Sequence, residues 1–220
     1  MSHLLTTPKG FLVSAIKSGI KASGKLDLGL IVADVKCNAA GVFSTNKIVS
    51  PTVTVTKKHI SSGYARAIYV NSGNANSCTG KRGYNDALKT AQHVATLCDI
   101  KTEDVLICST GIIGEFMPMN KVLTGVDKAF SQLGATRKTH KDFMHAILTT
   151  DLVKKEASVS LNLSGKQVTI SGVCKGSGML APNMATMLGF ITTDANISTP
   201  LLRKALRSSV ESTINKVSVD

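Results

Sequence analysis

Residues 175–190 read KGSGMLAPNMATMLGF. Lys175 and two glycines lead into an apolar patch, and Thr186 lies in the middle of that patch. The flanking patterns predict a β-hairpin over residues 155–174 and a further strand over residues 187–191. Thr186 then has two interpretations: a buried strand residue whose hydroxyl bonds to a neighbour, or a nucleophile. Taken alone, the local pattern favours the strand residue.

The segments around this stretch alternate between strand-like and helix-like patterns. β-Branched and alternating residues predict strands at 26–32, 40–45, 52–56, 67–70 and 105–108. Apolar residues at helical spacing predict helices at 84–97, 119–133, 140–149 and from about 199 to 216. These segments indicate an α+β fold, a layered sandwich of mixed sheets flanked by helices.

The composition supports a folded core of small aliphatic side chains. The 220 residues are 43% hydrophobic, but only 4% are aromatic and Trp is absent. The five cysteines include no C-x-x-C pair, and the five histidines share no ligand spacing. Neither a disulfide framework nor a metal site is therefore predicted.

The net charge of +12 raises the question of an anionic partner. The basic residues occur as isolated pairs and aromatics are scarce, so we expect a solvated surface and no nucleic-acid partner. No apolar run approaches the ~18 residues that span a bilayer, and residues 1–11 lack the apolar region of a signal peptide. We expect a cytoplasmic protein with no membrane partner, and an organellar location if a targeting segment is missing.

Two familiar motifs are rejected on their context. Residues 19–25 fit most of a phosphate-binding loop, but Leu26 replaces the hydroxyl residue and a strand follows where a helix should begin. The S-x-x-K matches at Ser14 and Ser18 lack the companion K-T-G element. Residues 71–80, NSGNANSCTG, suit either an anion-binding nest or a tight turn whose Asn side chains satisfy the loop, and the turn is favoured.

The segment STGIIG at residues 109–114 follows a short buried strand. Thr110 and Gly111 there suit either an ordinary strand-end turn or an oxyanion hole, in which two donors face a developing negative charge. The stretch alone favours the turn. Cys108 paired with a histidine is a further nucleophile candidate, and it is disfavoured because no spacing supports it.

Taken as a set, these segments resemble the ornithine acetyltransferases (glutamate N-acetyltransferases) of the acetylated route of arginine biosynthesis. The similarity covers the chain nearly end to end and in the family's order. The matching segments are Gly10-Phe11, Gly19-Ile20-Lys21, residues 27–46, NSGNANSCTG, STGIIGEFMP, ILTTD at residues 147–151, and KGSGMLAPNMATML.

The resemblance implies a self-cleaving enzyme of the N-terminal-threonine type. The hydroxyl of Thr186 attacks the carbonyl of Ala185, and the chain is cut between them. Residues 1–185 then form an α-chain, and residues 186–220 form the start of a β-chain. The new amine of Thr186 supplies the base that a weak hydroxyl nucleophile needs, because its reference pKa is about 7.7–8.0.

The resemblance also assigns a reaction and its residues. Thr186 takes the acetyl group of N-acetylornithine and passes it to glutamate, while Thr110 and Gly111 hold the oxyanion. Thr149, Lys175 and Thr186 bind substrate; on the KGSG pattern alone, Lys175 reads as a surface lysine at the hairpin end. No metal and no organic cofactor is implied, although acetyl-CoA is a second donor in bifunctional members. The α- and β-chains are expected to interlock and to form an (αβ)n oligomer.

Length is the main departure from the family, whose members continue well past residue 220. The resemblance therefore implies a truncated member that lacks the later β-chain residues. Three alternatives stay open beside the transferase. They are an N-terminal-threonine hydrolase (an aminopeptidase or amidase), an inactive fragment, and a basic binding protein.

Overall fold

The computed structural model describes residues 4–163, 165–184 and 186–219. Two β-sheets and five α-helices form within these ranges. Their bounds, in chain order, are β1 Phe11–Ile16, β2 Leu28–Asn38, α1 Pro51–His59, β3 Tyr64–Asn74, α2 Gly80–Cys98, β4 Val105–Ile112, α3 Met119–Phe130, α4 Arg137–Ile147, β5 Lys155–Leu163, β6 Lys166–Lys175, β7 Leu188–Thr193 and α5 Thr199–Ser212. Short 3₁₀ turns lie at Ile60–Ser62, Thr102–Asp104 and Ile214–Lys216.

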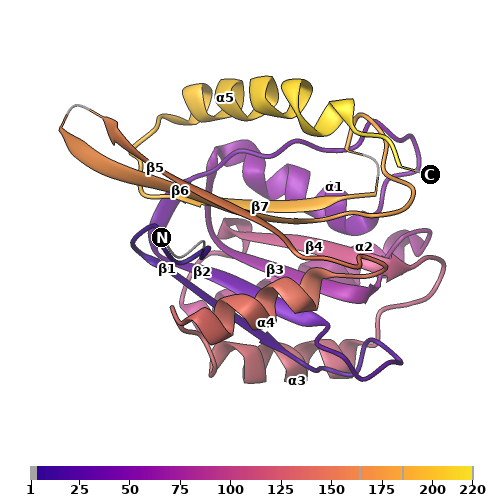
Figure 1. Cartoon of the computed structure of the whole chain (residues 1–220). Helices are drawn as coiled ribbons and strands as arrows, with labels where there is room; N and C mark the ends of the chain where they lie inside the picture. Colours follow the sequence, from indigo (N-terminus) through magenta and orange to yellow (C-terminus); the bar gives the residue numbers. More distant parts are fainter. Residues whose placement is uncertain (1–3, 164, 185, 220) are drawn as a thin grey trace.

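The first sheet has the strand order β1-β2-β3-β4 and is mixed. Its pairs are antiparallel except for β3 and β4, which run parallel. Parallel neighbours need a crossover connection, and α2 provides it. The second sheet is antiparallel, in the order β5-β6-β7. Figure 1 shows the second sheet between the first sheet and α5, with α3 on the far side of the first sheet.

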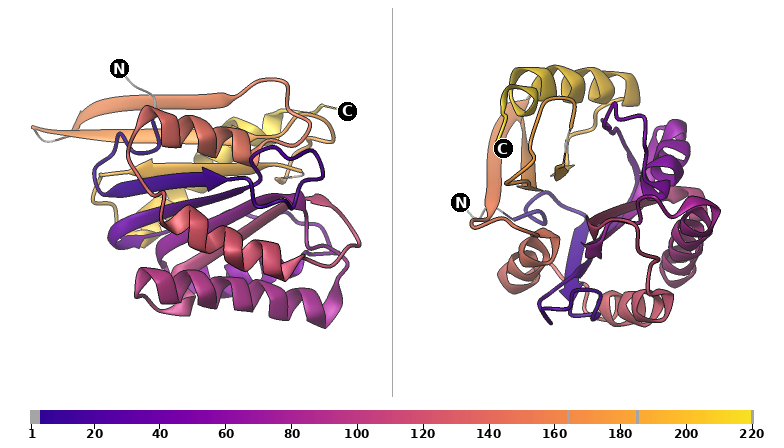
Figure 2. Two further views of the ribbon diagram at one scale, coloured as in Figure 1. Left: turned by 90° about the horizontal axis from the view of Figure 1, so that it is seen from below. Right: turned by 90° about the vertical axis from the view of Figure 1, so that its right-hand side faces the viewer.

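Each face of the first sheet is covered by its own apolar layer. Alternate residues of β2 and β3, such as Leu28 and Tyr69, pack with Val94 of α2 and Val122 of α3. Their neighbours along the strands point to the opposite face, as strand geometry requires. That face packs against α4 and the second sheet; its residues include Val13, Ile31, Val70, Phe143, Ile147, Val173 and Phe190. In the right-hand view of Figure 2 helices lie above, below and to the right of the sheets, and the orange strands β5 and β6 form the left side.

The predicted α+β class and most of its elements are confirmed. The hairpin forms as β5 and β6, and the strand after Thr186 forms as β7. Helix α4 begins earlier than predicted because Thr136 and Thr139 form a reciprocal capping box at its first turn. Within the described ranges, no helix combines the length and apolar character that crossing a bilayer requires.

Two predicted strands are wrong. Residues 52–56 lie in α1, which begins with Pro51 in its first turn. Its β-branched side chains do not pair in a sheet; Thr56 instead hydrogen-bonds the outer edge of β4 at Ile107, where both residues are buried. Residues 40–45 have no regular structure, because β2 ends at Asn38 and the ring of Phe43 folds back over Gly41.

Candidate active site

Thr110 and Gly111 lie near the carboxyl end of β4, opposite Ser72 and Gly73 of β3. Gly111 has a φ of +131°, and a Cβ atom built on it comes 2.4 Å from the carbonyl carbon of Gly73. A side chain has no room there, so the sequence needs glycine at this position. Thr110 is half-buried and Gly111 is exposed. Both are therefore fixed at the carboxyl end of the sheet's strands, a place where ligands commonly bind.

The segment of residues 71–80 lies at the same end of the sheet and is held by its own side chains. The Asn71 amide donates to the carbonyl of Asn74, and the Asn76 N–H donates to the side-chain oxygen of Asn74. The Asn76 amide in turn donates to the carbonyl of Gly83. The Asn side chains thus satisfy the loop's own backbone, which confirms the prediction of a tight turn.

The C-terminal end of α4 also contacts this carboxyl end of the sheet. The Ser72 hydroxyl donates to the carbonyl of Ala146 in the last turn of α4. The ammonium of Lys21 donates to the carbonyl of Leu148, the C-cap of that helix, at 2.7 Å, and to the carbonyl of Leu26 at 3.0 Å. A cation at a helix C-terminus is favourable because unpaired carbonyls gather there. Burial and the nearby charges of Lys25 and Lys175 lower the pKa of Lys21, against the opposing effect of Asp27.

Lys175, the last residue of β6, is buried with 3% of its surface exposed. Its ammonium donates to the hydroxyl of Thr149 at 3.2 Å. Burial lowers the pKa of Lys175, while the Asp151 carboxylate acts in the opposite direction. The alternative of a surface lysine is therefore wrong, and two predicted substrate-binding residues, Thr149 and Lys175, are in contact.

Asp151 adds a carboxylate to this group of residues. Its carboxylate accepts hydrogen bonds from the Lys155 ammonium and from the N–H of Gly176, both at 2.7 Å. Burial by itself raises the pKa of Asp151, but the bonds from Lys155 and Gly176 outweigh burial, and the pKa lies below its usual value. The carboxylate is thus held ionised next to Lys175.

Thr186 lies in a turn between β6 and β7 and is exposed. Its φ is +55°, which is rare for a β-branched residue. Met179, Asn183 and Met184 of the same loop also have positive φ values. Such strained conformations cluster at functional sites. Ala185, the other side of the predicted cut, lies outside the described residues.

The structure brings the predicted residues into two adjoining groups. Lys175 is bonded to Thr149, and a Cβ atom built on Gly176, the next residue, comes 3.6 Å from the Thr186 carbonyl oxygen. Thr110 and Gly111 form the second group, which α4 and Lys21 connect to the first. Among the described residues, no hydrogen bond joins Thr186 directly to the second group.

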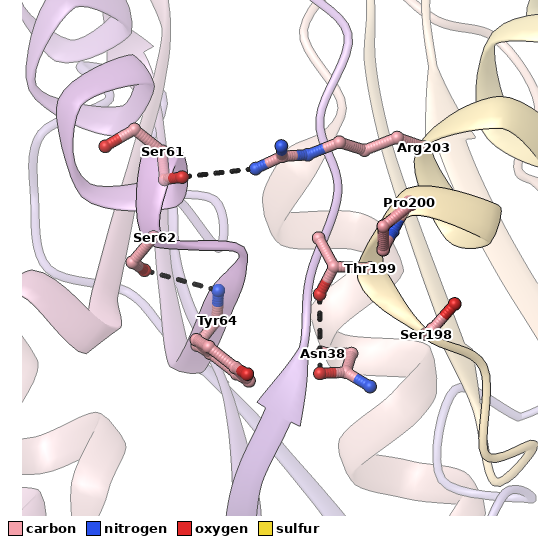
Figure 3. Close-up of a pocket in the computed structure, with 8 residues that line it drawn as sticks. All are labelled: Asn38, Ser61, Ser62, Tyr64, Ser198, Thr199, Pro200 and Arg203. Carbon is pink, nitrogen blue, oxygen red and sulfur yellow. Dashed lines mark hydrogen bonds between the residues drawn. The ribbon is translucent and has the colours of Figure 1, made fainter.

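Other candidates do not belong to this site. Burial raises the pKa of Cys108 to about 12, so its thiol is a poor nucleophile at neutral pH. In the described part of the chain, no three His, Cys, Asp or Glu side chains are placed to hold a metal ion. A pocket of about 420 Å³ lies at the start of α5 (Figure 3), where Arg203 donates to the carbonyl of Ser61. None of the predicted site residues lines it.

Comparison with known proteins decides the family. The model of the ArgJ family matches residues 12–220. The arginine biosynthesis bifunctional protein ArgJ of Caldanaerobacter subterraneus is 46% identical over 213 residues, which are 97% of this chain and 52% of that relative. The chain belongs to the ArgJ family. It spans about half the length of the curated relatives it matches.

Solved ArgJ structures have the same fold as this chain. The crystal structure of ArgJ from Bacillus halodurans has a TM-score of 0.79 and 41% identity, and the match covers 83% of this chain and 94% of that one. Ornithine acetyltransferase from Mycobacterium tuberculosis, complexed with ornithine, has a TM-score of 0.77 and 36% identity, with 84% and 96% covered.

A more distant match extends the fold comparison. An L-aminopeptidase D-Ala-esterase/amidase from Ochrobactrum anthropi, a variant of the Ntn hydrolase fold, has a TM-score of 0.55. The match covers 98% of this chain and 69% of that one. At 13% identity it shares the fold alone with this ArgJ-family chain.

Sequence reasoning missed Lys21 and Asp151. Both lie in segments that match the family, but their side chains carry no local signal. Lys21 stands in a rejected phosphate-loop pattern, and Asp151 stands at the end of ILTTD. Their partners are Leu148 and Gly176, which lie 127 and 25 residues away along the chain. Only folding brings them together.

Proposed function

We propose that this ArgJ-family protein transfers an acetyl group from N-acetylornithine to glutamate through an acetyl-Thr186 intermediate. The observation that carries the proposal is the arrangement at Gly176. The backbone of a strained, exposed Thr186 lies close to Gly176, and the preceding residue, Lys175, is buried and bonded to Thr149. An exposed hydroxyl supplies the nucleophile, and a buried cation favours a carboxylate substrate.

We infer that the protein first cuts itself between Ala185 and Thr186. The Thr186 hydroxyl adds to the Ala185 carbonyl, the C–N bond breaks, and water hydrolyses the resulting ester. Residues 1–185 become the α-chain, and Thr186 keeps its hydroxyl and gains a free amine. The exposed position and the positive φ of Thr186 support this step.

In the transfer step, the amine of Thr186 takes the hydroxyl proton while the oxygen attacks the acetyl carbonyl. The Thr110 hydroxyl and the Gly111 N–H stabilise the oxyanion. The C–N bond of the substrate then breaks, the amine returns the proton to ornithine, and ornithine leaves. Glutamate attacks the acetyl ester and restores Thr186, so the kinetics are ping-pong. Relatives named bifunctional support acetyl-CoA as a second donor.

The whole enzyme is proposed to hold its α- and β-chains together as an (αβ)n oligomer in the cytoplasm. Because the chain spans about half of its curated relatives, the assay should be run in two forms. One form is the chain alone, and the other is the chain co-expressed with the unmatched half of the Caldanaerobacter relative. Cross-linking followed by size measurement of the second form tests the oligomer.

The decisive experiment is an intact mass measured under denaturing conditions. We expect two fragments, residues 1–185 and 186–220, and a single uncut chain for Thr186→Ala. Thr186→Ser is the matched control, since it keeps a hydroxyl and should still be cut. Hydroxylamine trapping of an acetylated Thr186 and transfer of labelled acetyl to glutamate test the reaction. Release of acetate with no transfer would instead identify a hydrolase.

A further inference from the structure

Asp151 is a buried charge that the proposed chemistry does not use. Its side chain is 0% exposed, and its partner Lys155 is 37% exposed. The carboxylate accepts bonds from the Lys155 ammonium and the Gly176 N–H at 2.7 Å, and a longer one from the Thr149 N–H at 3.5 Å. Thr149 lies just after α4, and Gly176 lies just after Lys175, the last residue of β6. Asp151 therefore ties the chain after α4 to the end of β6.

Gly176 is the first residue of the loop that carries Thr186. This loop is tightly folded at its base, because a Cβ atom on Gly176 would come 2.9 Å from Leu180 and 3.3 Å from Met187. Its tip is held by a bridge from Leu180 to Val219 and by the bond from the Asn183 N–H to Asn215. A strained loop keeps its shape only where the surrounding contacts fix it.

We propose that Asp151 is a positioning residue of the Thr186 site. It fixes the base of the cleavage loop through Gly176 and holds the Lys175 ammonium against Thr149. The importance of Asp151 for catalysis rests on the proposed function, whereas its effects on the Gly176 amide and on Lys175 can be measured without any reaction. Burial lowers the pKa of Lys175 and the negative charge of Asp151 acts against that lowering, which favours the charged ammonium that binds a carboxylate.

Another aspartate–lysine pair of the chain, on the protein surface, serves as a comparison. Asp142 and Lys138 have the same four-residue spacing and a 2.6 Å contact. Their side chains are 28% and 84% exposed, and the pair lies on the surface of α4. Exposed pairs of this kind contribute little to stability. Asp151 differs by the complete burial of its side chain and by its bond to the loop backbone.

The test compares Asp151→Asn with Asp142→Asn, the matched control, in a Thr186→Ala background that keeps every chain uncut. Asparagine keeps the shape and one oxygen but removes the charge. NMR titration of the Lys175 ammonium should show a lower pKa in Asp151→Asn and no change in Asp142→Asn. In Asp151→Ala, which also removes the acceptor, hydrogen exchange at the Gly176 amide should be about tenfold faster, the effect of losing roughly 1.4 kcal/mol. Unchanged values for both measurements would overturn the inference.

Self-cleavage of the chain with its native Thr186 provides the third readout. Asp151→Asn should be cut about tenfold more slowly than the unmodified chain, whereas Asp142→Asn should match it. Equal cleavage rates in Asp151→Asn and the unmodified chain would also overturn the inference. If the unmodified chain is not cut at all, the proposed self-cleavage fails, and the titration and exchange data still decide the role of Asp151.

Discussion

Gly111 of β4 packs directly on the backbone of Gly73 in β3. A Cβ atom on Gly111 would come 2.4 Å from the Gly73 carbonyl carbon and 2.6 Å from the Asn74 nitrogen. These contacts involve backbone atoms, which have no freedom to move aside. The close approach fixes the direction of the Gly111 N–H, the donor that we assign to the oxyanion.

Gly111→Ala should therefore lower the free energy of unfolding by about 3 kcal/mol, through overpacking and an unfavourable φ. Gly114→Ala is the matched control: Gly114 also has a positive φ, but a Cβ atom there meets nothing within 4 Å. Its cost should be about 1 kcal/mol. Urea unfolding of both variants checks this, and equal losses would contradict the packing argument.

Thr56 completes the edge of the first sheet. Its hydroxyl accepts the N–H of Ile107 at 2.9 Å and donates to the carbonyl of the same residue at 2.6 Å. Thr56→Val keeps the shape but leaves both buried backbone groups unpaired, so it should cost about 2 kcal/mol or more. Thr54→Val, on the exposed side of α1, should change stability by less than about 0.5 kcal/mol. Thermal unfolding distinguishes the two variants, and similar losses would refute the role of the edge contact.

Asp151 should give the protein a pH-dependent stability in the acid range. Its folded pKa lies below the ordinary value of 3.8, so the fold favours the ionised carboxylate. The resulting stability is complete above the unfolded pKa and is lost as the pH falls through the folded pKa. The difference in unfolding free energy between the Thr186→Ala chain and its Asp151→Asn derivative should be constant from pH 7 to about 5 and shrink below about 4. Parallel stability curves down to pH 2 would rule this out.

Lys21 should stabilise the contact between α4 and the end of the sheet that carries Thr110 and Gly111. Its ammonium caps the carbonyl of Leu148, and its own backbone lies against Gly73. Lys21→Met keeps most of the side-chain length and removes both charged hydrogen bonds, which should cost about 1–2 kcal/mol. Lys25→Met, at an exposed position four residues on, should be nearly neutral. Chemical unfolding of the two variants tests this, and a neutral Lys21→Met would show that the cap is not needed.

Much of the fold was predictable from local pattern. Alternation along residues 155–174 gave the hairpin, and the apolar period of residues 84–97 gave the core of α2, because these signals depend only on near neighbours. The strand predicted at residues 52–56 was wrong because it, too, was inferred from near neighbours alone. Their β-branched side chains suit a strand, but Pro51 and the contact of Thr56 with Ile107 favour a helix. That contact spans 51 residues and has no local trace.

The candidate site divides in the same way. The sequence by itself determined the residue types at the site, with Thr186 in its apolar stretch and Thr110-Gly111 at a strand end, and the chain's place in a family. Only the tertiary structure decided that Lys175 is buried against Thr149, that Thr186 is strained, and that Lys21 and Asp151 join the site. Burial, backbone strain and long-range hydrogen bonds depend on which distant segments come together, and that is settled when both faces of the sheet are covered.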